Sequence, residues 1–190
     1  MLQAVLLFVV PALWIAWLVY WLVAARAVKT ARWRESTSSR LLHRVPLTLA
    51  AILLVGGRQL PSLLRERFLP HTFVYPIFGI VMLAAGLGFA VWARRHLGPN
   101  WSAMVTLKED HALIRTGPYN RVRHPIYSGI LLALLGTAVV IGEWRGLLAL
   151  ALGFSAFAYK SKVEEGRMRE IFPEYDPYCH ETAALIPWVF

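Results

Sequence analysis

Long apolar blocks, separated by short basic stretches, are the feature that most constrains how this chain can fold. A soluble domain would instead place its apolar residues at the period of one helix face or one strand face. Of the 190 residues, 57% are hydrophobic and only 16% are charged, which lies outside the usual range for soluble proteins. The sequence therefore predicts an all-α integral membrane protein, with one domain over residues 1–190.

The apolar blocks predict five transmembrane helices. A span needs about 20 apolar residues to cross a hydrocarbon core of about 30 Å, so the shorter blocks depend on their flanking residues. Because only residues 142–146 join the last two blocks, we expect these to form a tight antiparallel helical hairpin. The expected spans are Leu2 to Ala25, Val45 to Leu60, Val74 to Trp92, Ile126 to Ile141 and Trp144 to Tyr159.

The distribution of Lys and Arg predicts how the chain is oriented. Segments 26–44, 93–125 and 160–190 hold sixteen of the twenty basic residues, and such residues collect on the cytoplasmic side of a membrane. We therefore expect the N-terminus outside and the C-terminus in the cytoplasm. The same distribution, together with anionic lipid headgroups, accounts for the net charge of +9, and a nucleic-acid partner would require a polar domain that is missing here.

The first block is expected to stay in the membrane, because no positive n-region precedes it and because it is too long for a signal peptide. The compact size and the lack of targeting signals favour a multi-pass protein of a bacterial inner membrane. Cys179 is the single cysteine, which excludes an internal disulfide. The third expected span should pack closely against a neighbour through its small residues, which are Gly79, Ala84, Ala85, Gly86 and Gly88.

The loop before the fourth span mixes basic residues with His, Tyr, Pro and Gly. Gly117 and Pro118 predict a turn, and Pro125 has the fixed φ that suits the start of a helix. Arg123 and His124 should then lie at the cytoplasmic mouth of the fourth span, where free backbone N–H groups can bind a carboxylate or phosphate. A snorkelling Arg and a capping His explain the same residues equally well.

A second polar cluster follows the hairpin. Lys160 and Glu164 are four residues apart and share one helix face, which a tight hairpin returns to the side of Tyr127. A surface ion pair on a cytoplasmic helix is the simpler explanation of this pair taken alone.

Together these motifs resemble the isoprenylcysteine carboxyl methyltransferase family in its compact bacterial form. The similarity covers about residues 98–187, and it extends to the broad superfamily that includes phospholipid methyltransferases. The residues that carry it are Gly117-Pro118-Tyr119-x-x-x-Arg123-His124-Pro125-x-Tyr127-x-Gly129, then Glu164-Glu165, then Phe172-x-x-Tyr175-x-x-Tyr178.

The resemblance implies S-adenosylmethionine as cofactor, bound in a pocket that the cytoplasmic loop and a C-terminal helix form. Residues 1–92 would then supply three spans, and residues 93–190 the cofactor-binding loop, the hairpin and the tail. Lys160 and Glu164 would be catalytic, although Lys160 stands where the family commonly has an arginine, which weakens recognition of a carboxylate. The implied cofactor-binding residues are His111, Ala112, Leu113, Ile114, Tyr119, His124, Pro125, Ile126, Tyr127 and Glu164.

The resulting functional prediction is methyl transfer to a lipid-like or isoprenylated small molecule at the cytoplasmic membrane face, with isoprenylcysteine-type carboxyl O-methylation first. The alternatives are a phospholipid N-methyltransferase and an NADPH-dependent reductase of the sterol type. No obligate protein partner is expected. A channel is disfavoured because the interiors of the spans contain essentially no ionisable residues, and no metal is expected because the spacing of His96, His111 and His124 matches no zinc motif.

Overall fold

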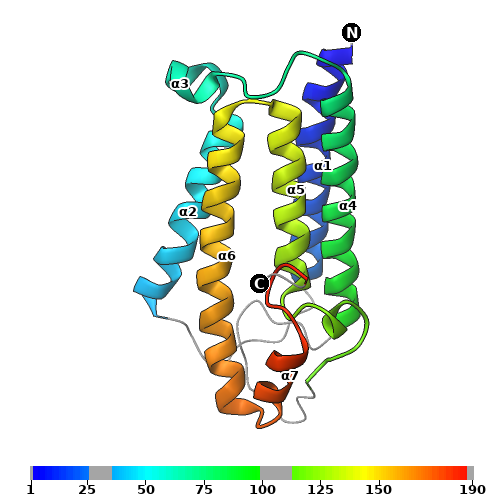
Figure 1. Ribbon diagram of the computed structural model, residues 1–190, viewed down its shortest axis with the longest axis vertical. Coiled ribbons are helices and arrows are strands. Elements are labelled where there is room, and N and C mark those ends of the chain that lie inside the picture. The colour runs from blue at the N-terminus through cyan, green and yellow to red at the C-terminus, as the bar shows by residue number, and fades with distance from the viewer. Residues whose placement is uncertain (1, 26–35, 99–112, 188–190) are drawn as a thin grey trace.

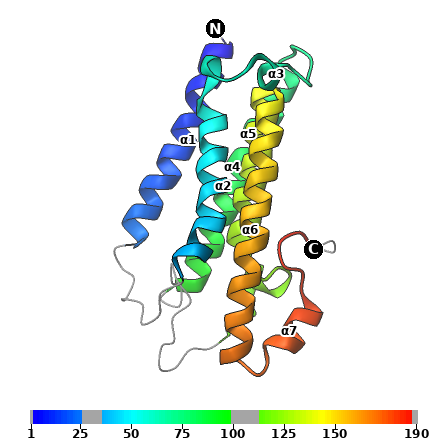
Figure 2. The same cartoon turned by 90° about the vertical axis from the view of Figure 1, so that its left-hand side faces the viewer.

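The structure, a computed structural model, describes residues 2–25, 36–98 and 113–187, and within these ranges every regular element is a helix. The elements are α1 (Leu2–Ala25), α2 (Thr37–Val55), η1 (Gly57–Gln59), α3 (Ser62–Arg65), α4 (Val74–Leu97), η3 (Gly117–Asn120), α5 (Pro125–Ile141), α6 (Trp144–Ile171) and α7 (Tyr175–Glu181). The long helices run side by side, with α3 at one end of the bundle and α7 at the other (Figures 1 and 2). We call these ends the α3 end and the α7 end.

Helix α2 begins eight residues before the expected second span, so the expected bounds Val45 to Leu60 are wrong. The side chain of Ser36 caps the helix by accepting a hydrogen bond from the backbone N–H of Ser39 at 3.2 Å. The first turns of α2 are polar, which is why hydropathy alone missed them. Gly56 ends α2, and the chain continues into η1.

Helices α4 and α6 both extend past the apolar blocks that predicted them. Helix α4 continues beyond Trp92 to Leu97, and α6 continues beyond Tyr159 to Ile171. The added turns are rich in Lys, Arg, Glu and Met, which are good helix formers when they project from a bundle. Phe172 caps α6 in an extended conformation, as expected for a residue that precedes a proline.

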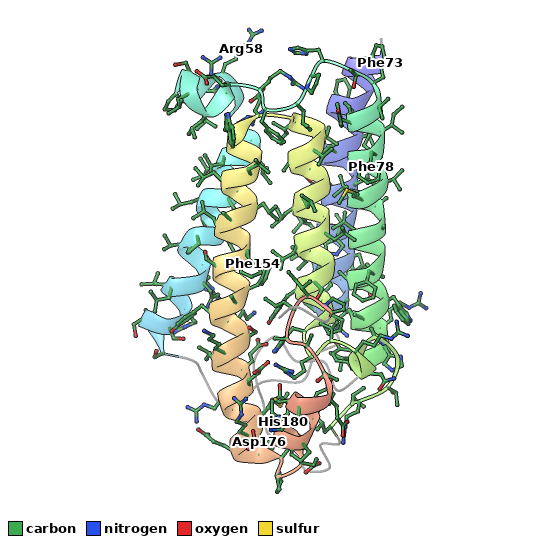
Figure 3. All side chains as sticks on the ribbon, in the orientation of Figure 1. Arg58, Phe73, Phe78, Phe154, Asp176 and His180 are labelled. Atoms are coloured by element: carbon green, nitrogen blue, oxygen red, sulfur yellow. The ribbon has the colours of Figure 1, made fainter. Side chains whose placement is uncertain are left out.

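Among the described residues, three helices are long and apolar enough to cross a membrane, namely α1, α2 and α4. Helix α5 is a shorter apolar helix of 17 residues. Figure 3 shows the matching distribution of side chains, with Arg58 at the α3 end, Asp176 and His180 at the α7 end, and Phe78 and Phe154 between them. These features are those of an all-α integral membrane protein; a five-span topology and its orientation stay predictions.

Helices α4 and α5 pack at backbone contact through reciprocal glycines. A Cβ atom on Gly79 would lie 2.6 Å from the carbonyl oxygen of Gly136, and one on Gly86 would lie 2.5 Å from that of Gly129. The expected close packing of the third span is thus confirmed at Gly79 and Gly86. It is wrong for Gly88, where an added Cβ would meet no atom within 4 Å.

The connection between α5 and α6 is covered by residues 66–69 at the α3 end. Arg67 donates from Nη1 to the carbonyl of Ile141 at 3.0 Å, and the backbone N–H of Phe68 donates to Gly142 at 3.0 Å. Trp144 donates its backbone N–H to the carbonyl of Glu66 at 3.1 Å. These bonds satisfy backbone groups that the helix ends leave without intrahelical partners.

Replacing Gly86 by alanine should destabilise the bundle, because the new methyl group has no space between α4 and α5. We expect a loss of about 1–3 kcal/mol in the free energy of unfolding, as for other overpacked sites. Gly88→Ala, two residues along the same helix, is the matched control and should leave stability unchanged or slightly higher. Thermal unfolding of both variants in detergent measures the difference, and equal melting temperatures would refute the contact.

Candidate functional site

The expected turn before α5 is present as the 3₁₀-helix η3 over Gly117–Asn120. Gly117 has φ +60°, and an added Cβ there would lie 2.6 Å from the ring of His96, so both the conformation and the space require glycine. His96 in turn lies 2.9 Å from the hydroxyl of Thr116 through Nε2. The turn is therefore fixed against the end of α4.

The segment after α7 is hydrogen-bonded to the start of α5. The backbone N–H groups of Arg123 and His124 donate to the carbonyls of Ala183 and Ala184 at 2.9 and 3.0 Å. The side chain of Arg123 also donates to the carbonyls of Cys179 and Thr182. Leu185 is fully buried, which anchors this segment in the bundle.

His124 lies between two consecutive carboxylates of α6. Its Nδ1 is 3.5 Å from Glu164 Oε2, and its Nε2 is 3.3 Å from Glu165 Oε1. Arg123 donates from Nε to the same Glu165 oxygen at 2.8 Å. Because both ring nitrogens face carboxylate oxygens, the doubly protonated ring satisfies this arrangement best.

Tyr127 joins this cluster from the first turn of α5. Its hydroxyl donates to Glu164 Oε1 at 2.7 Å, and the ammonium group of Lys160 lies 3.8 Å from the same oxygen and 5.2 Å from the Tyr127 ring centre. The Tyr127 ring stacks on His124 at 5.4 Å and on Phe157 at 4.8 Å. The expected return of the Lys160–Glu164 face to Tyr127 is confirmed.

The charges of this cluster shift one another's protonation, and all of these groups lie beyond the apolar part of the helices. Burial alone would lower the pKa of His124, but the hydrogen bonds and charges of Glu164 and Glu165 outweigh it and raise the pKa. Burial alone would raise the pKa of Glu164, yet His124, Lys160 and Tyr127 together lower it. For Glu165, His124 and Arg123 overcome burial and lower the pKa to about 2.

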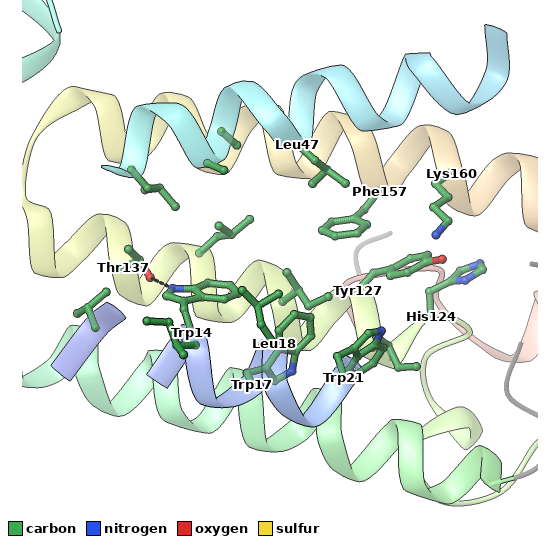
Figure 4. Close-up of a pocket in the computed structure, with 18 of the residues that line it drawn as sticks. Trp14, Trp17, Leu18, Trp21, Leu47, His124, Tyr127, Thr137, Phe157 and Lys160 are labelled. Carbon is green, nitrogen blue, oxygen red and sulfur yellow. Dashed lines mark hydrogen bonds between the residues drawn. The ribbon is translucent and has the colours of Figure 1, made fainter. Parts of the chain in front are cut away.

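A cavity of about 1470 Å³ connects this cluster with the interior of the bundle. Figure 4 shows His124, Tyr127 and Lys160 at one end and Thr137 farther along α5, with Trp14, Trp17 and Trp21 of α1 forming one wall and Leu47 and Phe157 the other. The lining continues to Arg67 and Arg145 near the α3 end. A polar cluster and a long apolar channel thus belong to one space.

Most of the predicted site residues that the structure describes meet in this cavity. They are Leu113, Ile114, Tyr119, His124, Ile126, Tyr127, Lys160 and Glu164. Pro125 is fully buried and begins α5 as expected, but it is not among the lining residues. His111 and Ala112 lie outside the described residues.

Other lining or supporting residues were not predicted as site residues. Glu165 follows Glu164 directly, and the matching pair Arg123–His124 could have indicated it. Trp14, Trp17 and Trp21 repeat at the helical period, so they share one face of α1. That repeat is a usable signal, although it is also typical of a helix that faces lipid.

Acid should weaken the fold through Glu165. Its pKa is lowered from 4.5 to about 2, so its stabilising contribution is present above pH 4.5 and is lost as the pH falls toward 2. The contribution is on the order of 3 kcal/mol. Melting temperatures measured across this window should fall less steeply for Glu165→Gln than for the unmodified protein. Glu174→Gln, at an exposed position, is the control and should follow the unmodified protein. If the melting temperature of Glu165→Gln falls with pH as steeply as those of the unmodified protein and the control, the assignment is contradicted.

Comparison with known proteins identifies a family and several relatives of this chain. The phospholipid methyltransferase family matches residues 74–175, which is more than half of the chain and contains His124, Tyr127 and Glu164. A cobalt-zinc-cadmium resistance protein of Cupriavidus metallidurans is 31% identical over 94 residues, which cover 48% of this chain and 43% of that protein.

Two further relatives are named as protein-S-isoprenylcysteine O-methyltransferases. The one from Schizosaccharomyces pombe is 28% identical over 148 residues, or 72% of this chain and 62% of the relative. The one from Arabidopsis thaliana, form B, is 28% identical over 116 residues, or 59% of each chain. The chain therefore spans less than two thirds of each of these relatives.

The resemblance inferred from the motifs is thus confirmed at the level of the family. The match runs from the start of α4 through the Lys160–Glu164 pair to the start of α7. This chain belongs to the phospholipid methyltransferase family, and it is also similar to protein-S-isoprenylcysteine O-methyltransferases.

Proposed function

We propose that this protein uses S-adenosylmethionine to methylate a lipophilic substrate at the cytoplasmic membrane face, by carboxyl O-methylation of an isoprenylcysteine-type molecule. The observation that carries the proposal is that one continuous cavity joins the charged cluster at His124 and Glu164 to the apolar interior. A reaction between a polar cofactor and a lipid needs a cavity with a polar part for the cofactor and an apolar part for the lipid. The membrane is then the source of the substrate.

The groups present at the α7 end fit such a cofactor. S-adenosylmethionine has a carboxylate, an amino group and ribose hydroxyls, and it supplies an electrophilic methyl group on a sulfonium. The carboxylate of Glu164 can bind the cationic or hydroxyl groups. The first backbone N–H groups of a helix have no intrahelical acceptor, so the start of α5 at Ile126 can bind the carboxylate, which the positive charge of His124 attracts. The segment 93–190 would hold most of this pocket.

The proposed chemistry needs little help from acids or bases. Methyl transfer to a carboxylate is an in-line displacement, so alignment of the reactants and exclusion of water supply most of the acceleration. Lys160 lies beside the Tyr127 ring, one helical turn from Glu164 toward the apolar interior. We assign to Lys160 the binding of the acceptor's carboxylate at the border between the polar and apolar parts.

The electrostatics favour an anionic acceptor over an amine. N-methylation of an ammonium group would first need a base to remove a proton. Glu164 is poorly suited to that role because its pKa is lowered by His124, Lys160 and Tyr127. The names of the relatives from S. pombe and A. thaliana support the same acceptor class.

The cofactor proposal predicts that S-adenosylmethionine binds to the detergent-purified protein and that Glu164→Ala abolishes this binding. The reason is that Glu164 supplies a carboxylate that lines the cavity and faces His124. Titration calorimetry measures the affinity, and Glu170→Ala, at an exposed position on the same helix, should bind normally.

NADPH is the second ligand in that experiment. Binding of NADPH in place of S-adenosylmethionine would assign the protein to the reductases. Equal binding by the Glu164→Ala and Glu170→Ala variants would remove Glu164 from the site.

The acceptor proposal predicts a methyl ester as product. Incubation of the protein with labelled S-adenosylmethionine and a prenylated thioether carboxylate should give label that alkali releases as methanol. Lys160→Met should raise the KM for this acceptor on the order of tenfold, as for the loss of one charge-assisted hydrogen bond. Lys160→Arg should retain activity or improve it, because a guanidinium binds a carboxylate in a bidentate manner. Alkali-stable label on an amine would show N-methylation instead.

A further inference from the structure

Trp14 reaches from α1 to α5 inside the cavity. Its indole N–H donates to the hydroxyl of Thr137 at 3.1 Å, as the dashed line in Figure 4 shows. Thr137 is only 2% exposed, and its hydroxyl donates in turn to the carbonyl of Ala133 at 2.8 Å. In apolar surroundings, releasing the indole N–H would leave a polar group without a partner, which is costly. The indole is therefore held in one orientation.

The cavity residues of α5 on either side of Thr137 are apolar. Ile130 and Leu134 line it toward the α7 end, and Val140 and Ile141 line it toward the α3 end. Such side chains can shift to accommodate a ligand without losing a hydrogen bond. The Trp14 indole cannot shift without losing its hydrogen bond to Thr137. It therefore has a fixed position along the cavity, whereas the apolar side chains around it can move.

That depth corresponds to a definite chain length. Ten residues separate Tyr127 from Thr137 on α5, which at 1.5 Å per residue is about 15 Å along the helix. An extended chain advances about 1.2 Å per bond, since one residue of three bonds spans at most about 3.6 Å. The distance therefore equals about twelve chain carbons.

We propose that Trp14 is a specificity-determining residue, which limits the length of the hydrocarbon chain that the cavity accepts. This inference rests on the proposed function, because it places the polar head of the acceptor beside Lys160. A chain of about twelve carbons ends before the indole. A longer chain must break the hydrogen bond between Trp14 and Thr137 to proceed.

The space beyond Trp14 makes the proposal testable. The lining continues from Thr137 to Arg67 near the α3 end, so removal of the indole gives longer chains room to extend. Trp14→Ala should shift the accepted length upward. Thr137→Val, which keeps the shape of the side chain but removes the acceptor, should release the indole and weaken the length limit.

Native mass spectrometry of the purified protein with an equimolar mixture of decanoate, dodecanoate, hexadecanoate and octadecanoate tests this directly. The unmodified protein should bind the two shorter chains in preference to the longer ones, on the order of tenfold, which is the effect of one lost buried hydrogen bond. Trp14→Ala should reverse or abolish the preference. Trp92→Ala, at a tryptophan of α4 that is 51% exposed and outside the lining, should keep it.

The outcomes separate this inference from the proposed function, because chain binding is measured without cofactor or methyl transfer. An unchanged length profile in Trp14→Ala would overturn the inference even if S-adenosylmethionine binds. Equal weakening of all chain lengths would show that Trp14 only supports packing, and it would overturn the inference too. A shifted profile supports the inference, and failure of S-adenosylmethionine to bind would then reject only the proposed reaction.

Discussion

Backbone contact between α4 and α5 determines where this bundle can hold a ligand. In lipid, helices gain little from burying apolar surface, so close contact between backbones must supply much of their association. Gly79 and Gly86 meet Gly136 and Gly129 at the distance of touching backbones, which commits one face of α5 to α4. The adjoining face, with Ile130, Leu134 and Thr137, then lines the cavity with α1, α2 and α6.

The polar end of the cavity depends on a second constraint, which is the neutralisation of buried charge. Two carboxylates of α6, Glu164 and Glu165, face Arg123 and His124 at the start of α5, and Lys160 of α6 itself pairs with Glu164. Buried charges are tolerated when they are paired and hydrogen-bonded. The carboxylate of Glu164 faces the cavity. Glu165 instead connects His124 with Arg123, and Arg123 is bonded to the segment after α7. Of these two adjacent residues, Glu164 is thus placed to contact a ligand, and Glu165 holds the surrounding segments together.

Local patterns in the sequence predicted those parts of the site that follow the helical period. Gly79 and Gly86 are seven residues, or two turns, apart, and they share the contact face; Gly88 is turned away from it, and composition alone did not show this. Lys160 and Glu164 were placed beside Tyr127 because a short hairpin leaves few alternatives. The pairing of Arg123 and His124 with Ala183 and Ala184 could not be predicted, because two short irregular segments carry no periodic pattern. The polar first turns of α2 were missed for a related reason, since a hydropathy pattern does not register a capping serine.

The hydrogen bonds between the segment after α7 and the start of α5 also bear on how the protein is made. Residues 183–185 follow α6 in the sequence, yet they hold the backbone N–H groups of Arg123 and His124 and the hydroxyl of Ser128. The apolar helices can enter the membrane one after another as they leave the ribosome. The polar end of the cavity is completed only later, when this segment has been synthesised and has docked at the start of α5. Insertion and maturation of the site are therefore separate events in the biosynthesis of this protein.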